Sequence, residues 1–252
     1  MKELQFPDFP RDEYLQRFTR TQQVLKAHGV DALFLTQRAN LRYFAGLRDG
    51  TWDAYHFYYF VILPAEGDPV MLVANGFQNL MKQCWIENIR YWAWTPEFYA
   101  ARETNSVKLL LEVLREQRLD AGVIGMELGS DMHMHLGRAH ADELLAGLPH
   151  ARIVDASDIV WELRCVKSER EIERIREATR ISMKGVQAGF EALQPGMTEK
   201  DVMKIVTSVM GAEGASELRF NALYAGERAM WADGMPTDNV IQPGDLVQFD
   251  GG

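Results

Sequence analysis

The chain has 252 residues, of which 47% are hydrophobic and 25% are charged, the proportions of an ordinary globular protein with one or two domains. Its 27 basic and 36 acidic residues leave a net charge of −9, which disfavours nucleic acid and anionic membrane surfaces as partners. No apolar run is long enough to span a membrane, the N-terminus has no signal-peptide core, and two distant cysteines make no disulfide framework. We therefore expect a cytoplasmic protein.

The first part of the chain alternates helical and strand patterns. Residues 12–28 are predicted to form a helix, because Leu15, Phe18 and Leu25 fall on one face and Gly29 suits a C-terminal cap. Further elements are expected as strands at 30–35, 58–63, 70–74, 122–126 and 153–156 and as a helix from Asn105 onward. The second and third of these strands are predicted to pair as a hairpin, and the alternation indicates an α/β fold.

Aromatic residues are dense between Trp85 and Tyr99. This segment lacks the basic interleaving of a base-stacking platform, and the net charge has the wrong sign for one. We expect these rings to pack in a core or at a subunit interface.

Two groups of side chains could carry chemistry on their own. His133, His135 and His140 are near one another, and imidazole is a common metal ligand. The stretch is expected to be helical, however, where side chains two apart do not face each other, and His-x-His alone is no zinc signature. A solvated helix face is the favoured interpretation, and Cys165 is expected to pack rather than to react.

Helix signals dominate the second half. After a short helix from Ser157, Ser168 and Glu171 form a capping box at the start of a long helix. The next helix is predicted to begin at Thr198 with Asp201.

The last residues combine a turn, a strand and an acid. Pro243–Gly244 is a turn signal, and the apolar run Leu246, Val247 and Phe249 is predicted to form a buried strand. Asp250 follows directly, and a buried acid is costly unless it is paired or bound to a metal. A hard metal ion accepts such an oxygen ligand. Two interpretations stay open, a metal ligand and a strand that ends in an Asp–Gly turn.

Several segments, taken together, resemble the creatinase/prolidase/aminopeptidase P family, the pita-bread metallopeptidases. They are Val30–Leu33 with Asn40–Gly46, Leu163–Ile172 with Ala178, Gln194–Glu199, and Pro243–Gly252. In that order they are similar to the opening of the N-terminal domain, the first catalytic-domain helix, the turn after it, and the segment with the first metal-binding Asp.

The resemblance implies a creatinase-type α/β N-terminal domain in residues 1–160, followed in residues 161–252 by the first part of a pita-bread α+β catalytic domain. Such enzymes use two divalent ions (Mn, Co, Fe or Zn), with Asp250 as one ligand and the others later in the chain. The sequence ends at Gly252, before those positions, so we expect the chain by itself to be inactive and its sheet edges to be exposed. A homodimer of the intact protein is also expected.

The resemblance implies a Xaa-Pro peptidase-like hydrolase of a small amide or dipeptide-like substrate. Aligning on Pro236–Asp238 places Asp233 where the family has a substrate-binding histidine, and no histidine follows His150. An ionised Asp233 accepts hydrogen bonds without donating them, which favours a substrate with an amine or amidine near the cleaved bond. The alternative is that Asp233–Gly234 is a solvated turn.

Two other functions stay open. One is a metal-free, creatinase-like amidinohydrolase, which the presence of Asp250 disfavours. The other is a non-catalytic binding or assembly module, which the absent loop histidine favours.

Overall fold

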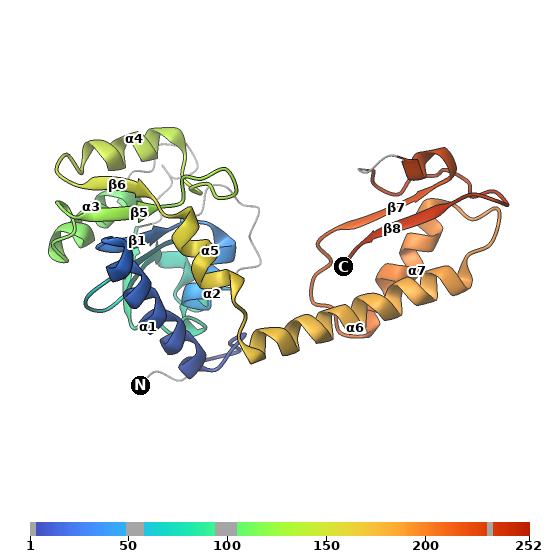
Figure 1. The fold of residues 1–252 in the computed structure, drawn as a ribbon, viewed down its shortest axis with the longest axis horizontal. Helices are drawn as coiled ribbons and strands as arrows, with labels where there is room; N and C mark the ends of the chain where they lie inside the picture. Colours follow the sequence, from blue (N-terminus) through green and yellow to red (C-terminus); the bar gives the residue numbers. More distant parts are fainter. Residues whose placement is uncertain (1–3, 49–57, 94–104, 231–233) are drawn as a thin grey trace. The chain divides into compact units, whose positions relative to one another are not determined.

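The computed structural model describes residues 4–48, 58–93, 105–230 and 234–252. The chain forms two compact units, Met1–Val166 and Lys167–Gly252 (Figure 1). The predicted boundary at residue 160 falls inside helix α5 (Ser157–Cys165), which belongs to the first unit. No helix in the described ranges is both long and apolar enough to cross a membrane.

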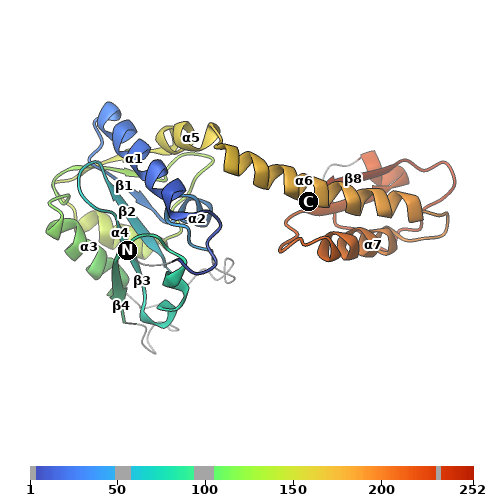
Figure 2. The same ribbon diagram turned by 90° about the horizontal axis from the view of Figure 1, so that it is seen from below.

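A six-stranded mixed sheet forms the centre of the first unit (Figure 2). Its strands are β1 (Ala32–Leu35), β2 (Phe60–Pro64), β3 (Val70–Ala74), β4 (Asn88–Trp92), β5 (Val123–Met126) and β6 (Arg152–Asp155). They lie in the order β4-β3-β2-β1-β5-β6, where β2 runs antiparallel to β1 and β3 and the other neighbours are parallel. The predicted hairpin of β2 and β3 is confirmed, as is the mixed α/β class.

Helices cover both faces of this sheet. The helices α1 (Arg11–His28), α2 (Arg38–Ala45) and α5 pack on one face, and α3 (Asn105–Glu116) and α4 (Arg138–Ala146) pack on the other. Because side chains alternate along a strand, Leu33 and Leu35 of β1 join the first layer while Phe34 joins the second. The 3₁₀ turns η1 (Asn75–Phe77) and η2 (Leu80–Lys82) follow β3.

A buried carboxylate lies at the carboxyl ends of β1 and β5. Glu127 directly follows β5 and is 0% exposed. Its Oε2 accepts hydrogen bonds from the backbone N and Oγ1 of Thr36 (2.7 and 2.9 Å) and the backbone N of Gln37 (2.8 Å), and its Oε1 accepts one from Asn40 Nδ2 (2.6 Å). Glu127 thereby caps α2, whose own N-cap residue Gln37 makes no side-chain cap. Burial raises the pKa of Glu127, although these hydrogen bonds oppose the shift.

The histidine stretch differs from the prediction. Helix α4 begins only at Arg138, so His133 and His135 lie in a loop and the helix expected there is wrong. The backbone N of His135 instead donates to Thr36 Oγ1 (2.7 Å), which holds the loop against the end of β1. Burial, with smaller contributions from Arg38 and His133, lowers the pKa of His135 and favours a neutral imidazole.

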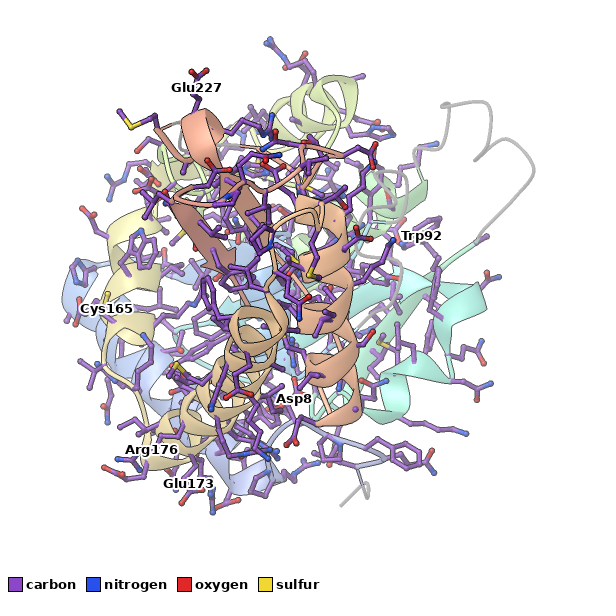
Figure 3. The ribbon with its side chains drawn as sticks, turned by 90° about the vertical axis from the view of Figure 1, so that its right-hand side faces the viewer. Asp8, Trp92, Cys165, Glu173, Arg176 and Glu227 are labelled. Carbon is purple, nitrogen blue, oxygen red and sulfur yellow. The ribbon has the colours of Figure 1, made fainter. Side chains whose placement is uncertain are left out.

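The structure confirms some of the predictions about packed side chains and contradicts others. Trp85 and Trp92 are buried, as expected for packing, whereas Tyr91 is 40% exposed. Residues 94–99 lie outside the described ranges, so the interface role of the aromatic segment stays a prediction. Cys165 was expected to pack, but it is exposed (Figure 3). It lies two positions after the buried Leu163, and residues two apart on a helix point in different directions.

The second unit places two helices on one face of a two-stranded antiparallel sheet. Its elements are α6 (Glu169–Ala192), α7 (Glu199–Ala212), β7 (Asn221–Ala225), the 3₁₀ helix η4 (Gly226–Met230) and β8 (Val247–Gly251). The predicted capping box of Ser168 with Glu171 on α6 is confirmed, and so is the predicted helix start at Thr198, where Thr198 and Asp201 also form a capping box on α7.

Helices α6 and α7 approach closely at two glycines of α6. A Cβ added at Gly189 would lie 2.4 Å from Val206 Cγ2, and one added at Gly185 would lie 2.8 Å from the carbonyl oxygen of Val206. Because Gly185 and Gly189 are one turn apart, they form a small-residue strip into which Val206 packs. Val206 belongs to the core that the helices share with Leu223 of β7.

Candidate active site

Strand β8 presents alternate residues to opposite sides. Val247 and Phe249 pack toward the core with α6 and α7, so Gln248 and Asp250 lie on the other face. The prediction of a buried strand is wrong in one respect: Leu246 precedes β8 and is 67% exposed, and β8 itself is half-buried. The reason is that the long helices α6 and α7 cover only one face of this sheet.

Asp250 is inside β8 and not at its end. It lies opposite Ala222 of β7, and Gly251 continues the pairing opposite Asn221, so the alternative of a strand ending in an Asp–Gly turn is wrong. The Asp250 side chain is exposed and forms no hydrogen bond or ion pair with any described residue. It is therefore an open carboxylate on a regular strand.

The face that bears Asp250 is partly covered by the segment that follows β7. Cross-strand partners share a face, so Ala222, opposite Asp250, and Tyr224, opposite Gln248, lie on this side. Both are buried in a small cluster with Ala229 of η4. Helix η4 therefore folds back over the sheet face to which Asp250 belongs; its Glu227 side chain is exposed (Figure 3).

The segment that follows β7 also contacts the Asp250 face where it turns back toward β8. The backbone N of Gly234 donates to the Tyr224 hydroxyl (2.8 Å), and a Cβ at Gly234 would lie 2.8 Å from Tyr224 Cε1. Asp233, the predicted substrate contact, lies outside the described residues, so its role stays a prediction. The next residue, Gly234, is nevertheless hydrogen-bonded to Tyr224 on the Asp250 side of the sheet.

A buried carboxylate at the start of α7 organises this region. Glu199 is 0% exposed. Its Oε1 accepts hydrogen bonds from the backbone N of Ala225 (3.0 Å), Nε of Arg228 (3.0 Å) and Nδ2 of Asn239 (3.1 Å). Its Oε2 accepts from the backbone N and Oγ1 of Thr237 (2.9 and 2.8 Å). The carboxylate thus connects α7 to the end of β7, to η4 and to the chain that returns toward β8.

Hydrogen bonding decides the charge of Glu199. Burial alone would raise its pKa, but the hydrogen bonds from Thr237, Asn239 and Ala225 outweigh burial and lower the pKa below its ordinary value. Glu199 is therefore ionised at neutral pH, and the Arg228 guanidinium at 3.0 Å supplies the opposite charge.

Sequence reasoning did not single out Glu199. Acidic residues are common in the first turn of a helix because they complement the helix dipole, so Glu199 after the cap residue Thr198 resembles any exposed first-turn acid. The donors that bury it come from up to 40 positions away, and no spacing rule connects them.

The candidate metal ligands can be tested for fit. Asp250 suits a hard ion as a single oxygen ligand, because it is exposed and free of hydrogen bonds to described residues. Within the described parts of the chain, no group of three or more His, Cys, Asp or Glu side chains could hold a metal ion. The histidines make other contacts within the described residues. His140 Nδ1 lies 3.3 Å from the Tyr58 hydroxyl, and the backbone N of His135 donates to Thr36 in the loop before α4.

Two protein families match the chain. The Creatinase/Prolidase N-terminal domain matches residues 17–166, and Metallopeptidase family M24 matches residues 173–252. Ectoine hydrolase from Halomonas elongata is 30% identical over 216 residues, covering 82% of this chain and 50% of that protein. Creatinase from a Bacillus species is 27% identical over 251 residues, covering 96% of this chain and 57% of that protein.

Solved structures share the fold. A dipeptidase from Mycobacterium ulcerans aligns with a TM-score of 0.77 and 22% identity, over 96% of this chain and 61% of that one. A prolidase from Thermococcus sibiricus aligns with a TM-score of 0.79 and 17% identity, over 94% of this chain and 61% of that one. The chain thus spans between half and two thirds of the length of these relatives. Since the N-terminal domain model alone matches 150 of the 252 residues (17–166), the chain belongs to the creatinase/prolidase family, and its second unit is part of a family M24 pita-bread domain.

Proposed function

We propose that the intact protein is a metal-dependent hydrolase of a small amide or dipeptide-like substrate, with its reaction centre on the Asp250 face of the second unit. The observation that carries this proposal is the position of Asp250: an exposed carboxylate without a described partner, on the paired part of a regular strand. A strand interior holds a ligand more rigidly than a loop does. The similarity to proteins named as an ectoine hydrolase, a creatinase and a dipeptidase supports hydrolysis of a small molecule.

In this proposal two divalent ions (Mn, Co, Fe or Zn) bind at the site, and Asp250 supplies one of their oxygen ligands. Bound ions of this kind activate a water molecule and polarise a carbonyl group. The chain's own contribution is to hold the Asp250 carboxylate on β8 and to place the segment after β7 beside it. Tyr224 and Gly234 anchor that segment.

The test is the substitution Asp250→Ala in the intact protein, with metal content measured by elemental analysis and hydrolysis measured on Xaa-Pro dipeptides and small cationic amides. We expect bound metal and turnover to fall together, because a carboxylate ligand has been removed. The control Glu217→Gln removes an exposed acid that pairs only with Arg219. Unchanged metal content in the Asp250→Ala variant would show that the site lies elsewhere.

The creatinase similarity supports a second candidate, an amidinohydrolase that uses side chains only. Turnover that survives both metal removal by a chelator and Asp250→Ala would favour this candidate over the first.

The substrate is proposed to carry an amine or amidine near the cleaved bond, because Asp233 in ionised form attracts a cation and accepts hydrogen bonds. Asp233→His and Asp233→Asn are expected to hydrolyse cationic amides more slowly than wild type does. Asp233→His is also expected to hydrolyse Xaa-Pro dipeptides faster than wild type does. Wild-type cleavage of Xaa-Pro dipeptides that neither variant alters would remove Asp233 from the site.

The intact protein is also proposed to be a cytoplasmic homodimer to which the N-terminal domain contributes. Light scattering at micromolar concentration checks this assembly, and a monomer would contradict it.

A further inference from the structure

The chain makes a long excursion between the two strands of the second unit. Residues 226–239 leave the end of β7, and the described parts on either side of residues 231–233 lie close to the Asp250 face. The departure uses Gly226 in the left-handed region (φ 62°), where a side chain would be strained. A Cβ there would also lie 3.1 Å from Asp245 Oδ1, so the turn is tight.

One carboxylate holds both ends of this excursion. At the departing end, the Ala225 backbone N and Arg228 Nε donate to Glu199 Oε1. At the returning end, Thr237 donates twice to Glu199 Oε2, and Asn239 Nδ2 bridges Glu199 Oε1 and the carbonyl oxygen of Ala225. Removing the carboxylate would leave several donors unpaired at once, one of them buried and the others partly buried.

The same contacts extend to the middle of the excursion. Arg228, oriented by Glu199, donates through Nη2 to the carbonyl oxygen of Met235 (3.1 Å). Gly234, which precedes Met235 in the chain, donates to Tyr224, which lies on the Asp250 face. Hydrogen bonds from Glu199 through Arg228 thus reach Met235, and the backbone connects Met235 to the residue that contacts Tyr224.

We infer that Glu199 is a positioning residue of the hydrolase: by holding the described parts of the excursion, residues 226–230 and 234–239, it sets where they lie beside the Asp250 face. The inference rests on the proposed function. Glu199 itself touches neither substrate nor metal in this account, because its carboxylate has no exposed surface, accepts hydrogen bonds at both oxygens and acts through Arg228 and Thr237.

The test compares Glu199→Gln with Glu213→Gln in the intact protein. Glutamine keeps the volume but turns an NH₂ group toward donors, whereas Glu213 only pairs with Arg180 and Lys184 at the surface. Hydrogen exchange is measured by segment. We expect Glu199→Gln to speed exchange in residues 226–239 by ~10-fold or more, with α6 unchanged. Equal acceleration in α6 would show a general loss of stability and overturn the inference.

Steady-state kinetics give an independent readout. The substrate is one that wild type hydrolyses, chosen from a panel of Xaa-Pro dipeptides and small cationic amides. We expect Glu199→Gln to raise KM ~10-fold, with metal content unchanged and a smaller change in kcat. A merely structural role would lower the active fraction and leave KM unaltered, and that result would overturn the inference.

Thr237→Val provides a milder variant, because it removes one donor to Glu199, Oγ1, and the hydrogen bond that the same oxygen accepts from the backbone N of Asn239. We expect a change in the same direction of about threefold, and no additional change when it is combined with Glu199→Gln, since both act on one contact. Additive effects would contradict the inference. If wild type hydrolyses no panel member with metal added, the proposed function fails, and the exchange comparison alone still decides whether Glu199 positions the excursion.

Discussion

The two units each enclose a fully buried glutamate, and their surroundings shift the two pKa values in opposite directions. Glu127 accepts hydrogen bonds from Thr36, Gln37 and Asn40, and burial nevertheless raises its pKa. Glu199 also has no exposed surface, yet its hydrogen bonds outweigh burial and lower its pKa. The absence of exposed surface therefore does not by itself determine the direction in which the pKa of a carboxylate shifts.

The depth of burial explains the difference. Four hydrogen bonds lower the pKa of each carboxylate, but Glu127 lies deep in the interior of its unit, where the cost of burial exceeds them, whereas Glu199 lies closer to the surface of its unit, where they exceed it. For stability, Glu199 also has an ion pair with the Arg228 guanidinium, whereas the donors to Glu127 are neutral. A charge-assisted hydrogen bond is about twice as strong as a neutral one. Glu127 caps one helix within a closed sheet, and Glu199 joins a helix, a strand and a long excursion beside the candidate site.

The largest expected effect comes from Glu199→Gln. It should lower the free energy of local opening of the chain around Arg228 and Thr237 by about 3 kcal/mol, with α6 unchanged, because an ion pair is weakened and several donors lose their acceptor. Segment-resolved hydrogen exchange measures this loss, with α6 as the internal reference. A loss as small as that of the surface variant Glu213→Gln would show that the buried contacts contribute little.

The next effect separates helix packing from the Glu199 contacts. Gly189→Ala should cost about 2 kcal/mol, because its Cβ would lie 2.4 Å from Val206 Cγ2. The matched change Gly211→Ala on α7 has no atom within 4 Å of the new Cβ and should be neutral or stabilise by up to about 1 kcal/mol. Denaturation midpoints measure both. Equal effects would mean that α6 and α7 are not closely packed at Gly189.

Glu127→Gln should be milder, at about 1.5 kcal/mol, because the cost of burying a charge disappears together with the lost acceptor. Exchange of amides in α2 should report the change, since Glu127 caps that helix. A loss larger than that of Glu199→Gln would reverse the comparison between the two glutamates.

The smallest effect is a difference in pH dependence. The contribution of Glu199 to stability is present above the ordinary pKa of 4.5 and is lost as the pH falls through its lower folded value. The contribution linked to Glu127 has the opposite sign: it is present below 4.5 and is lost as the pH rises through its raised folded value. Opening free energies from hydrogen exchange, corrected for intrinsic rates, should therefore change in opposite directions near Thr237 and in α2. Slopes of the same sign would contradict the assignment.

Local signals were sufficient for much of the fold. The capping box at Ser168, the helix start at Thr198 and the left-handed Gly29 at the end of α1 are confirmed, because each depends on groups within a few residues in sequence. Five strands of the first sheet were predictable for the same reason: their apolar runs are short and continuous. Strand β4 was not predicted, because its apolar residues alternate with Asn88 and Arg90. The loop around His133 and His135 was not predictable, because a hydrogen bond to the distant Thr36 holds it.

The sequence by itself determined that an acid follows an apolar run at two places, Glu127 after β5 and Asp250 near the end of the chain. Only the tertiary structure decided whether each acid is buried and hydrogen-bonded or exposed. Strand β5 lies between β1 and β6 with α-helices on both faces, so Glu127 is buried and paired. Strand β8 has α6 and α7 on one face, and the short η4 covers the other face only in part, so Asp250 is exposed. The physical reason is that the cost of burying a carboxylate depends on which neighbours surround it, and those neighbours come from distant parts of the chain.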